Sequence, residues 1–518
     1  MQNMARRVHL HALLPGLGAL VLSISGCGRS GEDGYSGPYR HVVVISLDTF
    51  RADHIGAYGA QRPTPSMDAL CQEGVVFTAA QAPATTTLAS HTSMMTGTWP
   101  HTHGVPRNGF VLSDQNVTLA EVLGGSGFHT AAVLGSFALE SRFHFNQGFD
   151  HFDEEFELLV TSGNDQNQKL AETVTDKALE HLDQVTDEER VFLFLHYFDT
   201  HSNYAPPPKY AEAVTGNREL TSDMRHVEQA VRERQAKMLG IPVSESPGHS
   251  GVIIGGLAGP HRALITRPTG EPSQFDRTLA ALYAGEALYV DDQIGRLLSG
   301  LEERGLLDEA IVVITGDHGE TFWEHGDLWN HGLWVYQTTA HVPFVLRLPD
   351  GRFAGEEVAA AVSTVDLLPT LCDLLGLEQP DRVDGRSLVP LASGETQDRG
   401  PVFSEATQPW QVRGQGWENS AKPRSVRWGN WKYVRSPYNK IEELFDLEED
   451  PGERTNLLAA GEEGLTPEAA RELELLRGAL DDWSAQADPL PSEFDRTQTE
   501  ETREMLKGMG YAGDDEGD

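Results

Sequence analysis

Cysteine and positive charge are both scarce in this sequence. Three cysteines in 518 residues are too few for a disulfide scaffold. The 40 Lys and Arg residues stand against 78 Asp and Glu residues, a net charge of −38. Nucleic acids bind basic surfaces, so this balance excludes a nucleic acid as the natural partner. Hydrophobic residues still make up 39% of the chain, which excludes bulk disorder and is enough for a packed core.

The sequence also lacks an apolar run long enough to cross a membrane, which takes about 20 residues. The apolar stretch near the N-terminus runs from about Leu10 to Ile24, is interrupted by Pro15 and follows two arginines. This pattern is typical of a signal peptide. The small residues just before Cys27 resemble a bacterial lipobox, whose cysteine becomes the lipidated first residue after cleavage.

We therefore predict a lipoprotein signal peptide over 1–26, a linker over 27–38, and membrane contact through the lipid anchor only. The expected location is the bacterial cell envelope, on the periplasmic or extracellular face. An ordinary signal peptide with an incidental cysteine is the alternative. Export would place Cys71 and Cys372 in an oxidising compartment, where a disulfide and two lone buried thiols are both open.

Three continuous apolar runs predict buried parallel strands of an α/β sheet. They are His41–Leu47, Val191–Leu195 and Ala310–Ile314, and their lack of alternation is typical of strands covered on both faces. Before the third run, apolar residues from Val290 to Leu301 recur at helical spacing. A helix, a short loop and a buried strand form the repeating unit of a doubly wound sheet, whose ligands bind beyond the carboxyl ends of the strands.

Changes in composition predict the domain limits. A large domain covers 39–395, and its proline- and glycine-rich stretch at about 206–277 is an insertion over the ligand-binding edge. Residues 396–518 form a smaller subdomain with an acidic tail. In it, Arg424–Val434 alternates around a Gly-Asn turn, which predicts a β-hairpin.

Acidic and histidine side chains follow the predicted strands. Asp48 follows the first strand, and Asp317 and His318 follow the third. An Asp after a strand is by itself more typical of a turn or a helix cap. Together these three can hold a divalent cation.

Several ordered motifs between about His41 and Asn456 resemble the sulfatase family of the alkaline phosphatase superfamily. The resemblance implies an alkaline phosphatase/sulfatase-like α/β sandwich with a large, mostly parallel sheet, a small C-terminal antiparallel sheet and a metal-dependent ester hydrolase activity. The motifs are Leu47-Asp-Thr-Phe-Arg-Ala-Asp-His54, Thr64-Pro-Ser-Met-Asp68, Gly74-Val-Val-Phe-Thr78, Thr96-Gly-Thr-Trp-Pro-His-Thr-His-Gly104, Gly316-Asp-His-Gly-Glu320, Val365-Asp-Leu-Leu-Pro-Thr-Leu371, Asp384-Gly-Arg-Ser-Leu388 and Leu444-Phe-Asp-Leu-Glu-Glu-Asp-Pro-Gly-Glu453.

The chain departs from that family at the nucleophile. Thr87 stands where sulfatases carry the cysteine that is oxidised to formylglycine, and a threonine cannot become that aldehyde. The superfamily also contains nucleotide pyrophosphatase/phosphodiesterase-like enzymes with a threonine nucleophile and an asparagine 21 residues later, and Asn108 lies 21 residues after Thr87. This resemblance implies that Thr87 attacks and that Asn108 holds a phosphoryl oxygen. A nearby cation would acidify the hydroxyl.

The resemblance assigns further groups to the site. The resemblance implies that His201 contacts the bound ester and that His331 is a basic group near the leaving oxygen. Alternatively Asp199, with His201 and His331, would hold a second metal ion. The donor set leaves zinc, manganese, calcium and magnesium open, as one ion or two.

Three functions remain open at this point. The first is phosphate ester or diester cleavage through Thr87. The second is sulfate ester hydrolysis by an unmodified hydroxyl, and the third is a catalytically silent lipoprotein that binds glycans or lipids. The substrate, which can be glycan- or lipid-linked, cannot be read because the pocket walls lie in the insertion.

Overall fold

The structure is a computed structural model that describes residues 39–161, 164–186, 189–201, 204–218, 242, 272, 274–326, 331–407, 421–437 and 440–494. The signal peptide and linker, most of the predicted insertion and the acidic tail lie outside these residues. Cys27 and the lipid anchor therefore stay predictions.

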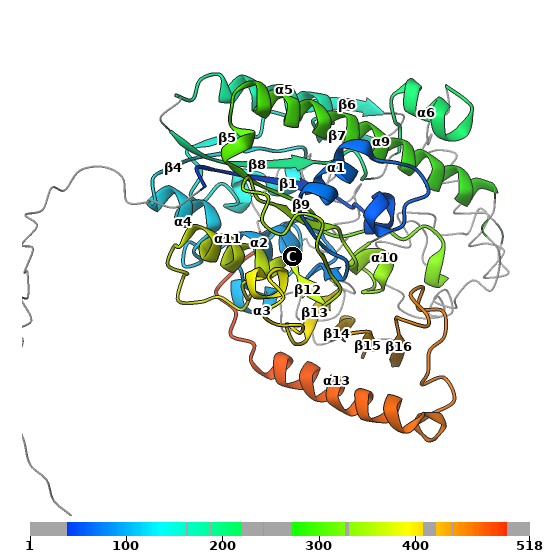
Figure 1. The fold of residues 1–518 in the computed structure, drawn as a ribbon. Coiled ribbons are helices and arrows are strands. Elements are labelled where there is room, and N and C mark those ends of the chain that lie inside the picture. The colour runs from blue at the N-terminus through cyan, green and yellow to red at the C-terminus, as the bar shows by residue number, and fades with distance from the viewer. Residues whose placement is uncertain are drawn as a thin grey trace, which may run out of the picture.

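A large mixed sheet of eight strands forms the centre of the molecule (Figure 1). All neighbouring strands pair in parallel except β10, which is antiparallel to both neighbours. The three predicted strands are confirmed as β1, β8 and β9, which lie side by side. In spatial order the strands are β11 (Glu357–Val358), β2 (Val75–Phe77), β10 (Phe344–Arg347), β9 (Ala310–Gly316), β1 (His41–Leu47), β8 (Arg190–Tyr197), β4 (Phe128–Val133) and β5 (His151–Asp153).

Helices cover both faces of this sheet, which explains the continuous apolar strands. Because side chains alternate along a strand, Val42 and Val44 of β1 pack into one core and Val43 and Ile45 into the other. On the Val42 face lie α2 (Thr87–Thr96), α4 (Leu119–Gly125) and α11 (Leu367–Leu375). On the Val43 face lie α1 (Pro65–Glu73), α5 (Ala171–Leu182) and α9 (Gln274–Glu303).

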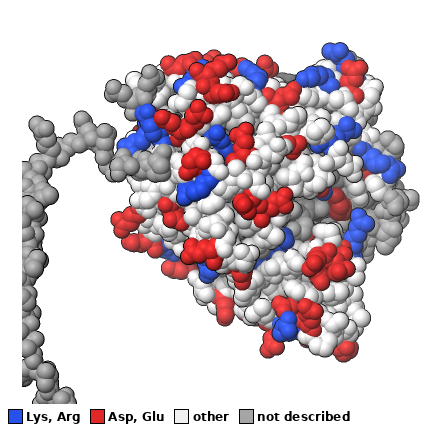
Figure 2. All heavy atoms as spheres, viewed as in Figure 1, with Lys and Arg blue, Asp and Glu red and all other residues white. Residues whose placement is uncertain are grey.

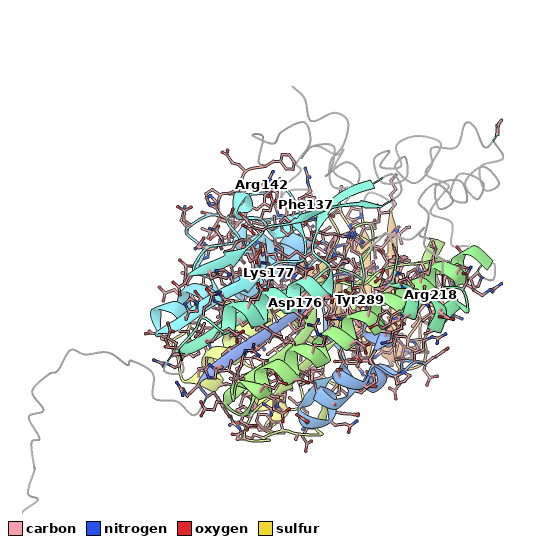
Figure 3. All side chains as sticks on the ribbon, turned by 90° about the horizontal axis from the view of Figure 1, so that it is seen from above. Phe137, Arg142, Asp176, Lys177, Arg218 and Tyr289 are labelled. Atoms are coloured by element: carbon pink, nitrogen blue, oxygen red, sulfur yellow. The ribbon has the colours of Figure 1, made fainter. Side chains whose placement is uncertain are left out.

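The predicted helix around Val290 is confirmed, and α9 extends it to 30 residues. Figure 3 shows α9 beside α5, with Tyr289 and Asp176 labelled on the two helices. The Arg296 guanidinium of α9 bonds the Asp176 carboxylate at 2.6 Å. Helix α6 (Pro208–Thr215), which lies within the predicted insertion, also packs on α9.

A four-stranded antiparallel sheet forms the C-terminal part of the described chain. It consists of β13 (Val402–Glu405), β14 (Arg424–Trp428), β15 (Trp431–Ser436) and β16 (Ile441–Asp446). The predicted hairpin is confirmed as β14 and β15, in which Trp428 pairs with Trp431 across the turn. Gly429 in that turn has a φ of 58°, a left-handed conformation that suits glycine. Helix α13 (Pro467–Ala485) covers this sheet.

Shorter elements connect these layers. Two small sheets pair β12 with β3 and β6 with β7. The remaining elements are β3 (Ala80–Gln81), β6 (Glu157–Thr161), β7 (Asn164–Gln168), β12 (Val362–Ser363), α3 (Pro100–His103), α10 (Gln337–Ala340) and α12 (Val389–Ala392).

Cys71 and Cys372 are both free and buried, so they are two lone thiols and do not form a disulfide with each other. They pack in different cores, on opposite faces of the large sheet. Burial raises the pKa of both thiols, to about 12 for Cys71 and about 11 for Cys372. Both therefore remain protonated and unreactive at neutral pH.

The surface of the described chain is polar and predominantly acidic. Figure 2 shows Asp and Glu side chains spread over the visible face, with Lys and Arg side chains between them. Among the described residues, helices that are both apolar and long enough for a membrane span are absent.

Candidate active site

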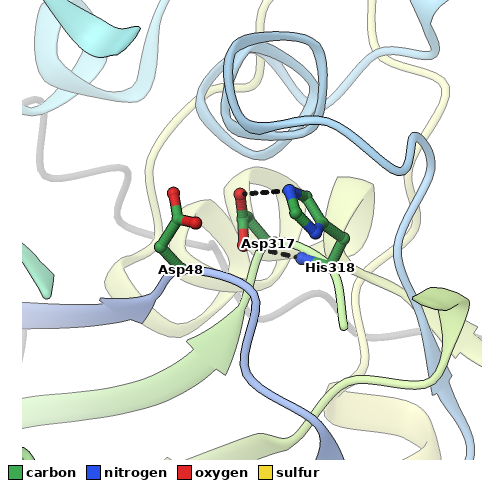
Figure 4. A group of neighbouring side chains, drawn as sticks. All are labelled: Asp48, Asp317 and His318. Carbon is green, nitrogen blue, oxygen red and sulfur yellow. Dashed lines mark hydrogen bonds and ion pairs between the residues drawn. The ribbon is translucent and has the colours of Figure 1, made fainter. Parts of the chain in front are cut away.

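Two neighbouring strands bring three potential metal ligands together at the carboxyl edge of the large sheet. Asp48 directly follows β1, and Asp317 and His318 directly follow β9, whose last residue pairs with the last residue of β1. One ligand atom from each residue lies within 4.8 Å of the other two (Figure 4). In the described parts of the chain this is the one such group of three or more. We call these three residues the metal cluster.

Backbone groups orient two members of the metal cluster. Asp317 Oδ1 accepts hydrogen bonds from the backbone N–H groups of Thr49 at 3.0 Å and His318 at 2.7 Å. His318 Nδ1 lies 3.0 Å from the Gly319 carbonyl oxygen, which can only accept. The Nδ1 atom therefore carries the proton, and Nε2 presents a lone pair to the cluster.

Two buried histidines lie next to the metal cluster, and one of them bonds a carboxylate of the cluster. His196 Nε2 donates to Asp48 Oδ2 at 3.1 Å. His91 Nδ1 donates to the Thr87 carbonyl at 2.8 Å and lies 3.6 Å from Asp317 Oδ2. Burial lowers the pKa of His196 to about 4 and that of His91 to about 3, so both rings are neutral. The sequence analysis gave neither residue a role.

The metal cluster fits a divalent cation. Asp48 Oδ1, Asp317 Oδ2 and His318 Nε2 are all buried and make no hydrogen bond of good geometry among the described residues, although His318 Nε2 lies 3.3 Å from Asp317 Oδ2 (Figure 4). Burial away from water raises the pKa of both carboxyls to about 7, and the negative charge of Asp48 raises the pKa of Asp317 further. A bound cation would remove this cost. Two carboxylates and one imidazole suit zinc or manganese better than calcium, which prefers oxygen ligands.

Thr87 is the first residue of α2, and its hydroxyl faces the metal cluster. Its side chain is fully buried. The hydroxyl is close enough to Asp48 to lower the pKa of that carboxyl, although no donor and acceptor of good geometry join the two in the described chain. Ser90, one turn along α2, donates to the Asp317 carbonyl at 2.6 Å and ties the helix to the end of β9. The positive end of the helix dipole also lies at Thr87.

Asn108 lies beside Thr87, as the 21-residue spacing predicts. Its Oδ1 accepts from the Leu88 backbone N–H at 2.7 Å, in the first turn of α2. Its Nδ2 is buried and has no protein partner among the described residues. An amide held by its oxygen presents its N–H groups to a ligand.

His331 and His201 lie at the side of the metal cluster. The His331 ring lies 4.5 Å from the His318 ring and 5.2 Å from the His201 ring, measured between centroids. Glu320 Oε2 lies 3.3 Å from His331 Nδ1 and accepts from the Tyr204 hydroxyl at 3.3 Å. Glu320 was noted only as part of a motif, and Tyr204 was not noted at all. The pKa of Glu320 is raised to about 7 by burial.

Asp199 is not brought to the metal cluster. Its Oδ1 accepts from the Ala171 backbone N–H at 3.1 Å, at the first residue of α5, and it lies near Glu286 of α9. A carboxylate at a helix N-terminus is a capping arrangement. Asp199, His201 and His331 do not form a group that could hold a second ion in the described structure.

The backbone beside Asp48 is strained. Thr49 has a φ of 50°, a left-handed conformation that costs a branched residue about 1 kcal/mol or more. The Tyr283 hydroxyl donates to the Thr49 carbonyl at 2.8 Å, and the Thr49 N–H donates to Asp317. Nearby, Arg51 forms a two-bond ion pair with Asp53.

Comparison with known proteins supports the α/β fold described above. The chain is similar to an N-acetylglucosamine-6-O-sulfatase of Bacteroides thetaiotaomicron, with 24% identity over 85% of this chain and 86% of that protein. The fold is also similar to that of a protein solved in complex with its substrate D-glucosamine-2-N,6-O-disulfate. The two structures have a TM-score of 0.66 and 22% sequence identity, over 87% of this chain and 98% of that one. A phosphonate monoester hydrolase of Agrobacterium radiobacter has a TM-score of 0.63 and 22% identity, over 88% and 97%.

Family models cover most of the described chain. The sulfatase model matches residues 40–377, which contain the metal cluster, Thr87, Asn108, His201 and His331. The model of the C-terminal part of N-sulphoglucosamine sulphohydrolase matches residues 324–477, which include the small antiparallel sheet. The first match covers more than half of the sequence. The chain therefore belongs to the sulfatase family of ester hydrolases.

Proposed function

We propose that this protein is a metal-dependent hydrolase that cleaves phosphate esters, and diesters in particular, with Thr87 as the nucleophile. The observation that carries the proposal is the position of the Thr87 hydroxyl. It is buried, lacks a well-formed hydrogen bond within the described chain, and faces both the metal cluster and the Asn108 amide. A catalytically silent binding protein has no need of so many unpaired buried polar groups, each of which destabilises the fold.

The residues suggest two chemical steps. Thr87 Oγ1 attacks phosphorus, so that a Thr87–phosphorus bond forms while the bond to the leaving oxygen breaks. Water then cleaves the phosphothreonine and regenerates the hydroxyl. Asn108 Nδ2 donates to a peripheral oxygen of the phosphoryl group, where charge spreads in the transition state. Asp48, Asp317 and His318 would hold a cation, which would supply Lewis acidity that acidifies the Thr87 hydroxyl.

The histidines beside the metal cluster are placed to handle protons. His331, held by Glu320, would protonate the leaving oxygen, and His201 would contact the ester. The proton that Thr87 loses goes to solvent water before the ester binds, because the carboxylates of the cluster would be occupied by the cation. We include Asp199 in neither role, because its carboxylate caps α5.

Sulfate ester hydrolysis is the second candidate, and the relatives favour it. One relative carries the name N-acetylglucosamine-6-O-sulfatase, and one similar structure binds a disulfated glucosamine. These names make a glycan-linked ester a reasonable substrate class. Thr87 argues against sulfate ester hydrolysis, because an unmodified hydroxyl lacks the hemiacetal that lets formylglycine expel sulfate.

A panel of nitrophenyl esters tests the proposal. We expect a phosphate diester to be cleaved at a kcat/KM at least ~10-fold above that for the corresponding sulfate, with phosphate and phosphonate monoesters measured alongside. A tenfold ratio corresponds to about 1.4 kcal/mol of transition-state preference. A sulfate ester cleaved faster than every phosphorus ester would replace the proposal with the second candidate.

We also propose that the mature protein is attached to the bacterial cell envelope through a lipid on Cys27. A Cys27→Ser variant is expected to move from the membrane fraction to the soluble fraction, because the acyl chains would be lost. Cell fractionation followed by immunoblotting measures this, and Cys71→Ser serves as the matched control. Membrane partitioning of Cys27→Ser equal to that of the wild type would contradict the lipid anchor.

A further inference from the structure

The segment 104–112, which we call the Asn108 loop, has little regular structure of its own. It connects α3 to the rest of the Val42 face and includes two glycines with left-handed backbone, Gly104 at φ 87° and Gly109 at φ 88°. On its inner side, His103 Nε2 lies 2.9 Å from the Ser93 hydroxyl of α2. The Asn108 side chain itself bonds α2. These contacts fix only the inner side of the loop.

The outer side of the loop is covered by a segment nearly 400 residues later in the sequence. We call Asp488–Phe494, which follows α13, the C-terminal strap. The backbone N–H of Leu490 donates to the Thr102 carbonyl at 3.0 Å, and the N–H of Val111 donates to the Glu493 carbonyl at 2.9 Å. Phe110 and Phe494 form an antiparallel bridge between loop and strap. The strap therefore bonds the end of α3 on one side of the loop and residues 110 and 111 on the other.

The contact between loop and strap is too close for ordinary side chains. A Cβ on Gly104 would lie 2.0 Å from the Leu490 carbonyl oxygen, and a Cβ on Gly109 would lie 2.5 Å from the Phe494 ring. Asn108 directly precedes Gly109, so the Phe494 ring packs against the residue next to the candidate oxyanion ligand. This close approach restricts movement of the loop away from α2.

Phe494 also holds the residue on the other side of Asn108. The Arg107 guanidinium lies over the Phe494 ring at 4.7 Å and over the Phe110 ring at 5.2 Å. Arg107 is 2% exposed, so this cation–π contact is well shielded from water. Phe494 thus contacts the residues before and after Asn108.

Helix α13, which precedes the strap, packs on both the small C-terminal sheet and α3. Trp483 of α13 lies 4.8 Å from the Phe403 ring of β13 and 4.5 Å from the His101 ring of α3, between centroids. The Asp488 backbone N–H then donates to the His101 carbonyl at 3.1 Å. A continuous series of contacts therefore runs from the C-terminal sheet, through α13 and the strap, to α3 and the Asn108 loop.

We infer that Phe494 is a positioning residue that holds the Asn108 amide in place for catalysis, so that the C-terminal subdomain completes the active site. This inference rests on the proposed function of Asn108. An amide that donates to a peripheral oxygen acts mainly in the transition state, where charge on that oxygen is greatest. Loosening the loop should therefore lower kcat more than it raises KM.

The test compares Phe494→Ala with Phe156→Ala, a closely matched control. Both phenylalanines are partly buried, both pack on the same core, and both contact a cation, since Lys169 Nζ lies 4.8 Å from the Phe156 ring. On the best ester of the panel, Phe494→Ala is expected to lower kcat about tenfold with little change in KM, a fraction of the loss seen when an oxyanion donor is removed outright. Phe494→Leu, which keeps apolar volume, should recover part of the rate, and Phe156→Ala should keep wild-type kinetics.

Hydrogen exchange separates failure of this inference from failure of the proposed function. Peptides covering 104–112 should exchange faster in Phe494→Ala than in the wild type or Phe156→Ala, whether or not a substrate is known. Unchanged exchange in these peptides overturns the inference. Faster exchange with unchanged kcat also overturns it, because the loop would then be held without consequence for catalysis. If no ester is cleaved, the proposed function fails, and exchange together with weaker binding of inorganic vanadate decides whether Phe494 positions the amide.

Discussion

Replacing Thr87 with alanine is expected to lower turnover of every ester substrate at least ~10³-fold while leaving metal content unchanged. This is the scale of loss when a nucleophile is removed from a site that otherwise persists. The metal cluster consists of Asp48, Asp317 and His318, so it does not require the Thr87 hydroxyl. Steady-state kinetics and elemental analysis of the same preparation measure the two properties. Thr87→Ser keeps a hydroxyl and should retain part of the rate.

Thr92→Ala is the matched control for this prediction. Thr92 lies on the same helix, is equally buried, and has a hydroxyl that also lacks a hydrogen bond in the described chain. It lies five residues along α2 and therefore points in a different direction, roughly 140° around the helix axis at 3.6 residues per turn. Wild-type activity in Thr92→Ala shows that a buried hydroxyl lost from α2 is not damaging in itself.

A trapped intermediate would identify the bond that forms. Acid quenching during turnover of a phosphate diester should leave on the Thr87 peptide a phosphoryl group that keeps the second ester substituent, visible by mass spectrometry and absent from Thr87→Ala. Equal activity of wild type and Thr87→Ala on all substrates would show that the nucleophile lies elsewhere.

Removing the divalent cation is expected to abolish activity and to lower the melting temperature. An ion that binds only the folded state at a hundred times its Kd stabilises the fold by about 2.7 kcal/mol. Without the ion, two buried carboxylates, each with its pKa raised to about 7, remain close together. Differential scanning fluorimetry with and without a chelator measures the stability, and readdition of single metals to the chelated protein identifies the ion that restores activity.

Asp317→Asn should remove this response to chelator, because the neutral amide is a much weaker ligand than a carboxylate. Asp291→Asn is its control. Asp291 is also buried, but it bonds the Ser66 and Met67 backbone N–H groups at the start of α1 and lies outside the metal cluster. Asp291→Asn should keep both activity and the chelator-dependent melting shift. A metal-free wild-type preparation with full activity would contradict the proposed role of the cluster.

The sequence was most informative where one strand or one local motif carried the signal. Buried parallel strands read as continuous apolar runs, and parallel strands end at the same edge, so the meeting of Asp48 with Asp317 and His318 could be predicted. The hairpin at Gly429 could be predicted because a two-residue turn leaves a local pattern. The spacing from Thr87 to Asn108 gave their proximity only through a resemblance.

Contacts between distant segments could not be predicted from the sequence where no pair of parallel strand ends brings the residues together. Asp199 follows a strand as Asp48 does, but its carboxylate bonds the N-terminus of α5, and no local pattern distinguishes the two cases. The pairing of Glu320 with His331 depends on how the chain returns after β9. The strap contact of Phe494 with the Asn108 loop joins residues 384 positions apart in the sequence, Phe110 and Phe494.

The order of strands in the large sheet also bears on how the protein behaves at high concentration. Its two outer strands are very short, with β11 spanning two residues and β5 three. A long edge strand offers a row of unpaired backbone groups on which a second chain can extend the sheet. Edges this short give such a chain almost nothing to pair with, so the longer strands β1, β8 and β9 are shielded from edge-to-edge aggregation.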